Sequence, residues 1–371
     1  MFSHFRRHLG RKAFPPGIKQ LLSQRKGILD NFFSLEVLEF EVSENGSSSM
    51  AARPFYYCSD IAGLIEFLVL SWNCEETDWS NNVGFDGGKG ILKMIWTLNL
   101  EEPNSSNGFK YNGARRSIII GAAPVPETYV NCEFFFKMIQ LNNISYQVCS
   151  DLKLINIIFG LQTHSASYPC PYALCFKLPD GTWQQGRDRS VASMEEEANK
   201  YLRSGTVRNQ LKRFHNEEHT PLVTPEDKNM AVACLAPVPP LHTCKLGPVN
   251  HLWDFLSKAC PSECAEFTSK FHLIKDSYHG GQFEGNECNV ILRNADTLLD
   301  LLPTAYKPFA LTLKALFKVN VAVCGMTLRP DFKEVINDFS RKWRFLNVKF
   351  GLTIPNKVCR FEFCFLLISE K

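Results

Sequence analysis

Three carboxylates stand out by their positions along the chain. Asp86 ends a predicted strand in the run Val-Gly-Phe-Asp-Gly-Gly-Lys-Gly, and Asp151 follows a later predicted strand in the run Gln-Val-Cys-Ser-Asp-Leu-Lys. Glu284 opens a predicted helix in the run His-Gly-Gly-Gln-Phe-Glu-Gly-Asn-Glu. If the two strands are neighbours in one sheet, the two aspartates meet at the same edge, where they repel each other unless a cation joins them.

Magnesium or manganese suits such a pair of carboxylates. Mg²⁺ is a hard ion that binds one or two carboxylates together with phosphate oxygens of the substrate. A third carboxylate permits two ions, of which one activates the attacking oxygen and the other stabilises the leaving oxygen of an in-line phosphoryl transfer. The leading hypothesis is a catalytic, metal-binding triad of Asp86, Asp151 and Glu284 that cleaves phosphodiester bonds.

Each member of this triad also has a structural explanation. Asp86 followed by Gly87 is typical of a type I′ hairpin turn, and Asp151 directly before a predicted helix is a good N-cap. The helix dipole favours Glu284 at a helix start irrespective of function, and Glu287 in the next turn is a rival for any catalytic role. The joint placement at two strand ends and a helix start favours an active site.

The elements that must position these residues occur in a regular order. The hydrophobic pattern predicts three strands, a helix, a fourth strand and a second helix, and a tight turn joins the first two strands. A meander followed by a crossover helix and a parallel strand predicts an α/β fold with an RNase H-like mixed sheet and flanking helices. The predicted ranges are 83–86, 91–100 and 117–122 (strands), 126–140 (helix), 143–150 (strand) and 152–162 (helix).

Other segments complete a four-part division of the chain. Residues 1–79 are predicted as a basic N-terminal region with helices, residues 80–163 as the first part of the RNase H-like core, residues 164–274 as a Cys-containing, helical insertion, and residues 275–371 as the C-terminal, helical part of the core. The remaining predicted elements are a helix or solvated arm ending at Phe33, a loop at 44–52, a helix at 59–73, a β-like piece at 173–178, and helices at 193–215, 250–259, 262–271, 285–302, 309–319 and 331–346.

Composition limits the classes of protein to which the chain can belong. It has 371 residues, of which 45% are hydrophobic and 21% charged, which excludes wholesale disorder. The 14 Cys are scattered without regular spacing and no apolar leader opens the chain, so we expect a reducing, intracellular location and no membrane span. The net charge of +3 is too balanced to indicate a polyanion partner, so a DNA partner must bind local basic patches.

Two basic patches are candidates for DNA contact. The segment before Gly27 carries seven Lys or Arg residues and no acidic residue; its DNA-binding candidates are Arg6, Arg7, Arg11 and Lys12. Near the C-terminus, the run Ser-Arg-Lys-Trp-Arg-Phe supplies Arg341, Lys342 and Arg344. Apolar residues recur there at spacings of three and four, which predicts that Trp343 faces a core.

A zinc site is a further candidate. Cys170 and Cys175 would pair with His164 upstream and with His242 or His251 after a Pro-rich linker, because Cys and His pairs close tetrahedral structural sites. Ordinary buried or surface thiols remain the alternative, since four residues separate the two Cys.

Several runs resemble the recurring blocks of transposon-derived proteins abundant in invertebrate genomes. These runs begin at Val83, Ser150, Ser167 and Tyr278, and their order is similar to that of cut-and-paste DDE transposases with an insertion before the final Glu. The resemblance covers most of the chain from about Phe14 onward. It implies that Asp86, Asp151 and Glu284 are the metal-binding triad, with two Mg²⁺ or Mn²⁺ ions, a DNA partner, a nuclear location and homo-oligomers.

The chain departs from this pattern at two positions. Ala173 stands where the block is expected to have a second Cys, and Cys359 follows Lys357 and Val358 where a His is expected. These departures support a second hypothesis, a catalytically inactive, domesticated module that binds nucleic acid or protein. A third hypothesis is a cytoplasmic scaffold with no nucleic-acid partner.

Overall fold

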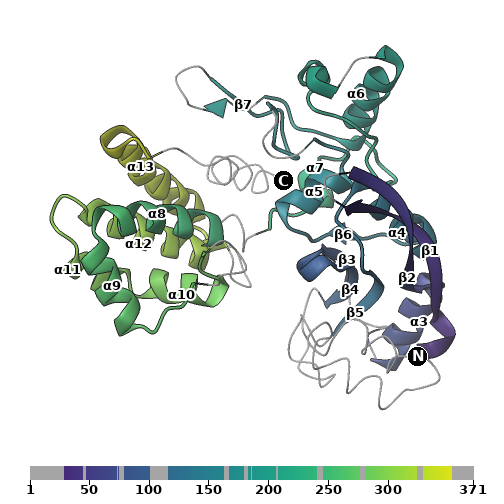
Figure 1. Cartoon of the computed structure of the whole chain (residues 1–371), viewed down its shortest axis with the longest axis horizontal. Helices are drawn as coiled ribbons and strands as arrows, with labels where there is room; N and C mark the ends of the chain where they lie inside the picture. Colours follow the sequence, from purple (N-terminus) through teal and green to yellow (C-terminus); the bar gives the residue numbers. More distant parts are fainter. Residues whose placement is uncertain are drawn as a thin grey trace. The chain divides into compact units, whose positions relative to one another are not determined.

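The computed structural model divides the chain into two compact units, each described by itself (Figure 1). The first comprises residues 1–174 and 186–237, and the second comprises residues 175–185 and 238–371. The structure describes residues 29–44, 47–72, 74, 79–100, 116–162, 167–178, 183–184, 186–205, 208–239, 245–275, 281–323 and 329–352.

A six-stranded mixed sheet forms the centre of the first unit, with the strand order β1-β2-β5-β4-β3-β6. Neighbouring strands are antiparallel except for β3 and β6, which are parallel. The four predicted strands are present, although β6 is much shorter than expected. The strands are β1 (Phe33–Glu44), β2 (Ser47–Cys58), β3 (Trp79–Asp86), β4 (Leu92–Leu100), β5 (Ser117–Ala123) and β6 (Gln147–Val148).

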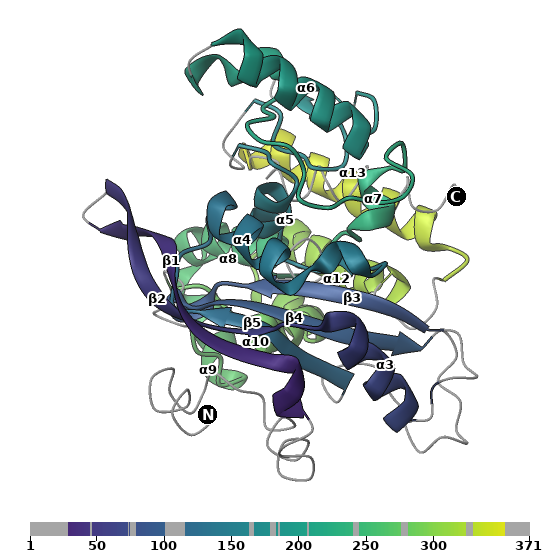
Figure 2. The ribbon, with the colours of Figure 1, turned by 90° about the vertical axis from the view of Figure 1, so that its right-hand side faces the viewer.

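Helices cover one face of this sheet. They are α3 (Ile61–Ser71), α4 (Tyr129–Ile139) and α5 (Leu152–Ile158), of which α4 and α5 lie over the sheet in Figure 2. Phe85 on β3 stacks on Phe136 of α4 with ring centroids 5.3 Å apart. Gly121 on β5 allows this close packing, because a Cβ at that position would lie only 2.8 Å from Cδ1 of Ile139. The helix α4 thus connects β5 to β6 across the buried face.

Local sequence explains where these helices begin and end. The side chains of Asp60, Thr128 and Asp151 cap α3, α4 and α5 by accepting the backbone N–H three residues on. Gln140 ends α4 in the left-handed conformation, with φ 58°. The predicted helices at 59–73 and 126–140 are confirmed, and the one at 152–162 ends earlier.

A long segment between Gln162 and Asn216, here called the excursion, follows α5. The chain then returns next to the residues that follow this helix. The Gln162 N–H donates to the carbonyl of Asn216 at 2.9 Å, and the Glu218 N–H donates to the carbonyl of Gly160 at 2.9 Å. The excursion contains α6 (Val191–Ser204) and the 3-10 helix η7 (Arg208–Phe214), and the short helix α7 (Val232–Leu235) follows its return. The single helix predicted at 193–215 is wrong, because Gly205 ends α6 in the left-handed conformation, with φ 62°.

The second unit is mainly helical. Two short strands, β7 (Phe176–Lys177) and β8 (Trp183–Gln184), pair antiparallel. The predicted helix at 285–302 is divided at Asn294 into two helices. The helices are α8 (Gly247–Ala259), α9 (Pro261–Lys270), α10 (Gly285–Arg293), α11 (Ala295–Leu301), α12 (Lys307–Val323) and α13 (Phe332–Phe350). None of the described helices has the length and apolar character needed to cross a membrane.

The N-terminal part of the sheet corrects the sequence prediction. A short 3-10 helix, η2 (Leu29–Phe32), ends one residue before Phe33, where the predicted helix ends. The earlier part of that predicted helix lies outside the described residues. The loop predicted at 44–52 is wrong, because β1 and β2 form a long antiparallel hairpin there. Its register pairs Glu44 with Ser47, which leaves two residues, an Asn-Gly pair, between the strands. Asn-Gly is typical of a two-residue hairpin connection. The serines after it are exposed, so the alternation of buried residues that would reveal a strand is missing there.

Candidate active site at the carboxyl ends of two parallel strands

The parallel pairing of β3 and β6 places Asp86 and Asp151 after adjoining strands. The Cys149 N–H donates to the carbonyl of Val83 at 2.8 Å, and the Phe85 N–H donates to Oγ of Ser150 at 2.7 Å. The residues immediately before the two aspartates are therefore bonded to each other. The prediction that these two strands are parallel neighbours in one sheet is confirmed.

Asp86 forms an ion pair in this structure. Its Oδ2 lies 2.6 Å from Nζ of Lys93 at the start of β4, and its Oδ1 accepts the Gly88 N–H at 3.3 Å. The carboxylate remains more than half exposed, at 57%. The type I′ turn predicted here is wrong, because Gly87 has a φ of −104° and the strand register leaves more than two residues between β3 and β4.

Asp151 is the N-cap of α5, as one of its two interpretations predicted. Its Oδ1 accepts the Leu154 N–H at 2.8 Å. Within the described part of the chain, Oδ2 has no hydrogen-bond partner. Capping and an additional role for the second oxygen are therefore compatible.

A third carboxylate, Glu127, lies beside these residues and was missed in the sequence. A Cβ on Gly87 would lie 1.9 Å from Oε1 of Glu127, so this side chain rests directly on the backbone next to Asp86. Glu127 also forms an ion pair with Lys153, two residues after Asp151. No local pattern marks Glu127, because its contacts come from two other elements.

Glu284 lies in the second unit, at the N-cap position of α10. Its side chain is exposed and makes no capping hydrogen bond. The preceding residue, Phe283, is fixed by Asn250 of α8: its N–H donates to Oδ1 at 2.8 Å, and its carbonyl accepts from Nδ2 at 3.0 Å. The rival Glu287 is half-buried, and its Oε2 is a buried atom without a hydrogen-bond partner in the described structure.

Only some of the predicted metal ligands lie among the described residues. Among the residues that the structure describes, no group of three or more His, Cys, Asp and Glu is arranged to hold a metal ion. Cys170 and Cys175 are both buried, while His164 and His242 lie outside the described residues. His251 stacks on Trp343 with ring centroids 6.0 Å apart. The zinc site stays a prediction.

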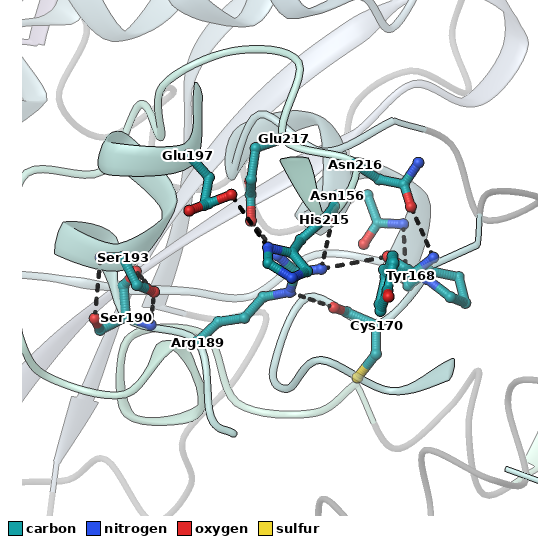
Figure 3. A network of polar contacts seen from close by, with 11 residues as sticks. Asn156, Tyr168, Cys170, Arg189, Ser190, Ser193, Glu197, His215, Asn216 and Glu217 are labelled. Atoms are coloured by element: carbon teal, nitrogen blue, oxygen red, sulfur yellow. Dashed lines mark hydrogen bonds and ion pairs between the residues drawn. The ribbon is translucent and has the colours of Figure 1, made fainter. Parts of the chain in front are cut away.

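A buried polar cluster organises the excursion (Figure 3). Arg189 forms an ion pair with Glu217, and both side chains are nearly inaccessible, at 2% and 1% exposed. The guanidinium also donates to the backbone carbonyl of Cys170 at 2.9 Å and to that of His215 at 2.9 Å. Burial raises the pKa of Glu217 to about 8, although the charge of Arg189 opposes the rise. The cluster ties together three segments far apart in the sequence.

The basic run on α13 is partly neutralised by one acid. Asp338 accepts from Arg341 at 3.1 Å and also pairs with Lys342, whose hydrogen bond lowers the pKa of Asp338. Trp343 is buried, as the spacing predicted, while Phe345 is 48% exposed. The other predicted DNA contacts, Arg6, Arg7, Arg11 and Lys12, lie outside the described residues.

Comparison with known proteins adds one match. A family model described as a domain of unknown function (DUF8703) matches residues 47–189, well under half of the chain. The matched range contains Asp86, Glu127 and Asp151 and ends at the buried Arg189, but it does not reach Glu284. No curated protein matches the chain.

Proposed function

We propose that the chain is a transposase-derived protein that cleaves and transfers DNA strands with the help of divalent metal ions. The observation that carries the proposal is the parallel pair β3 and β6, with Asp86 and Asp151 after their carboxyl ends. The strand order β5-β4-β3-β6, with α4 crossing from β5 to β6, supports an RNase H-like core. The resemblance to transposases supports a nuclear location and a homo-oligomer.

The donor set suits a hard cation that is held jointly with substrate. Two carboxylates on adjoining strands match the one or two that Mg²⁺ takes in addition to phosphate oxygens. Asp86 and Asp151 would hold it, with Glu284 as the third carboxylate. When bound, the metal would activate the attacking water or 3′-hydroxyl and stabilise the leaving oxygen.

Two lysines, Lys93 and Lys153, lie next to the carboxylates of the candidate site. Lys93 forms an ion pair with Asp86, and Lys153 forms one with Glu127. Both ammonium groups carry donors that suit phosphate oxygens. They would therefore help to position the DNA backbone when the carboxylates turn to the cation.

The decisive variant is Asp151→Asn, because asparagine caps helices about as well as aspartate but lacks the charge. We expect this variant to keep its thermal midpoint and to lose at least about 100-fold in Mg²⁺-dependent nicking of plasmid DNA, a loss typical when one group of a catalytic site is removed. Asp60→Asn is the matched control, since Asp60 caps α3 through the same kind of bond, to the Gly63 N–H at 2.9 Å. Nicking that survives Asp151→Asn would refute the mechanism.

The third carboxylate is tested by a second pair of variants. We expect Glu284→Gln to abolish nicking and Glu287→Gln to leave it unchanged. The reverse result would transfer the role to Glu287, one turn along α10.

One observation favours a second candidate function, an inactive module that binds DNA. Asp86 is already neutralised by Lys93 at 2.6 Å, and the described residues contain no three-ligand group. DNA binding that weakens with salt, together with an absence of Mg²⁺-dependent nicking, would select this function. In that case Arg341→Ala and Arg344→Ala should each reduce the salt dependence of binding.

A further inference from the structure

The outer edge of β1, the side that faces away from β2, carries backbone groups that could pair with an added strand. Among the strands that the structure describes, β1 ends the sheet and pairs with β2 alone. On its outer side, the Glu41 N–H donates to Oδ1 of Asn131 at 3.0 Å, and the Glu41 carbonyl accepts from Nδ2 of Asn131 at 2.9 Å. Since the N–H and C=O of a strand residue point to the same side and alternate along the strand, Leu35, Val37 and Glu39 also face away from β2.

These three residues offer their backbone groups to a partner. None of their N–H or C=O groups is bonded across the outer edge within the described part of the chain. Val37 is 70% exposed, which is unusual for a valine in a strand. Asn131 of α4 is 1% exposed and bonds to Glu41 as the peptide group of a neighbouring strand would. The edge therefore already accepts a strand-like partner at one position.

The opposite edge of the same hairpin is blocked. Pro54 on β2 lies across from Val37 in the register and has no N–H to donate. The outer part of the hairpin extends beyond the other strands (Figure 2), and β2 pairs with β5 only at Tyr56 and Tyr57. A further strand can therefore add to β1 but not to the free part of β2.

The charges along β1 indicate the chemistry of the partner. Glu36, Glu39 and Glu41 line this strand, and none of them forms an ion pair within the described residues. Glu36 accepts the Tyr57 hydroxyl at 2.6 Å, so it is oriented but not neutralised. A second copy of the chain would bring the same three carboxylates from each side into one junction, and like charges across paired strands are destabilising.

We propose that the outer edge of β1, at Leu35, Val37 and Glu39, binds an extended polypeptide segment rich in Lys and Arg as an added strand. The backbone groups of the three residues supply the hydrogen bonds. The carboxylates attract the cationic side chains and exclude acidic segments and nucleic acid. The proposal is independent of the DNA-processing function.

A fluorescein-labelled peptide of alternating lysine and valine tests the proposal by fluorescence anisotropy with the full chain. Val37→Pro removes the central N–H, and the fold should tolerate it because that group makes no bond to β2. We expect this variant to weaken binding by at least about tenfold, since backbone hydrogen bonds of the added strand are left unmade. The matched control is Val37→Thr, which keeps the N–H and should bind within about twofold of the unmodified chain.

Charge is tested separately with Glu39→Gln, which should weaken binding at low salt and reduce its salt dependence. Equal affinity for the unmodified chain and Val37→Pro would mean that charge alone attracts the peptide, and it would overturn the proposal. No saturable binding would also overturn it. A dimer in sedimentation that Val37→Pro dissociates would assign the edge to a second copy instead.

Discussion

At the residue scale, the ion pairs of the first unit fall into two kinds. In Asp86 with Lys93 and in Glu127 with Lys153, one partner is more than half exposed, so water and salt partly screen the charges. Arg189 with Glu217 is buried, and the second carboxylate oxygen of Glu217 has no partner in the described structure. The cost of removing both groups from water opposes their attraction, so a buried pair of this kind is weak evidence for stability.

The buried Glu217 predicts a pH dependence of folding. Its pKa is raised by burial from 4.5 to about 8, so the folded state holds this proton more tightly than the unfolded state does. The resulting stability is fully present below 4.5 and is lost as the pH rises through 8. From about pH 5.5 to about pH 8, we expect the free energy of unfolding in urea to fall by roughly 2–3 kcal/mol through this group.

The control for this prediction is Glu217→Gln, which has nearly the same shape and does not titrate. We expect this variant to show a flatter dependence of unfolding free energy on pH over the same interval. Parallel curves for the two proteins would show that Glu217 does not titrate there.

At the element scale, the candidate active site depends on the close approach of β6 to β3. A Cβ on Gly84 would lie 2.8 Å from the backbone carbonyl oxygen of Cys149, which cannot move without breaking the parallel pairing. We expect Gly84→Ala to reduce the free energy of unfolding by about 2 kcal/mol, the usual effect of overpacking. It should also abolish the proposed nicking, because Asp86 and Asp151 follow these strands.

Gly88→Ala is a matched control, since its Cβ would make only ordinary contacts, at 3.5 Å, with the Asp86 carboxylate. Chemical denaturation and the nicking assay measure both effects. Full nicking activity in Gly84→Ala would show that nicking does not depend on the pairing of β3 with β6.

The sequence predicted the part of the sheet in which burial alternates. Val83 and Phe85 on β3 and the apolar β5 showed period-two or continuous apolar patterns, and Asp151 directly before a predicted helix indicated its N-cap. The strand neighbourhood that brings Asp86 and Asp151 after adjoining strands followed from this order. The catalytic triad itself stays a prediction.

The remaining features had no local signal. The exposed serines at the start of β2 hid the hairpin. Asn131 and Asn250 look like ordinary helical residues, yet each bonds both backbone groups of a residue far away in the sequence. Glu127 likewise gains its place from Gly87 and Lys153. Such roles depend on tertiary partners, which hydrophobic periodicity does not encode.

At the scale of the whole molecule, the helical unit has a core of its own. Buried apolar residues from α8 to α13 form one cluster between Val249 and Leu352. We expect a fragment of residues 238–371 to fold alone, with a helical circular dichroism spectrum and a cooperative urea transition. Leu316→Ala in α12 removes a fully buried side chain and should lower the free energy of unfolding by about 2–4 kcal/mol.

The control for this fragment is Leu311→Ala on the same helix. Because Leu311 is 40% exposed, this change should leave the free energy of unfolding nearly unchanged. A fragment without a cooperative transition would show that the cluster needs the rest of the chain. Equal transitions for both variants would show that α12 does not pack as described.

The backbone bonds at the base of the excursion have an evolutionary consequence. The chain departs after α5 and comes back within hydrogen-bond distance, at Gly160 with Glu218 and at Gln162 with Asn216. Because the two ends are held together, residues can be gained or lost between them without displacing the strands below. Insertions and deletions among relatives should therefore accumulate in this stretch, while the separation of Asp86 from Asp151 stays nearly constant.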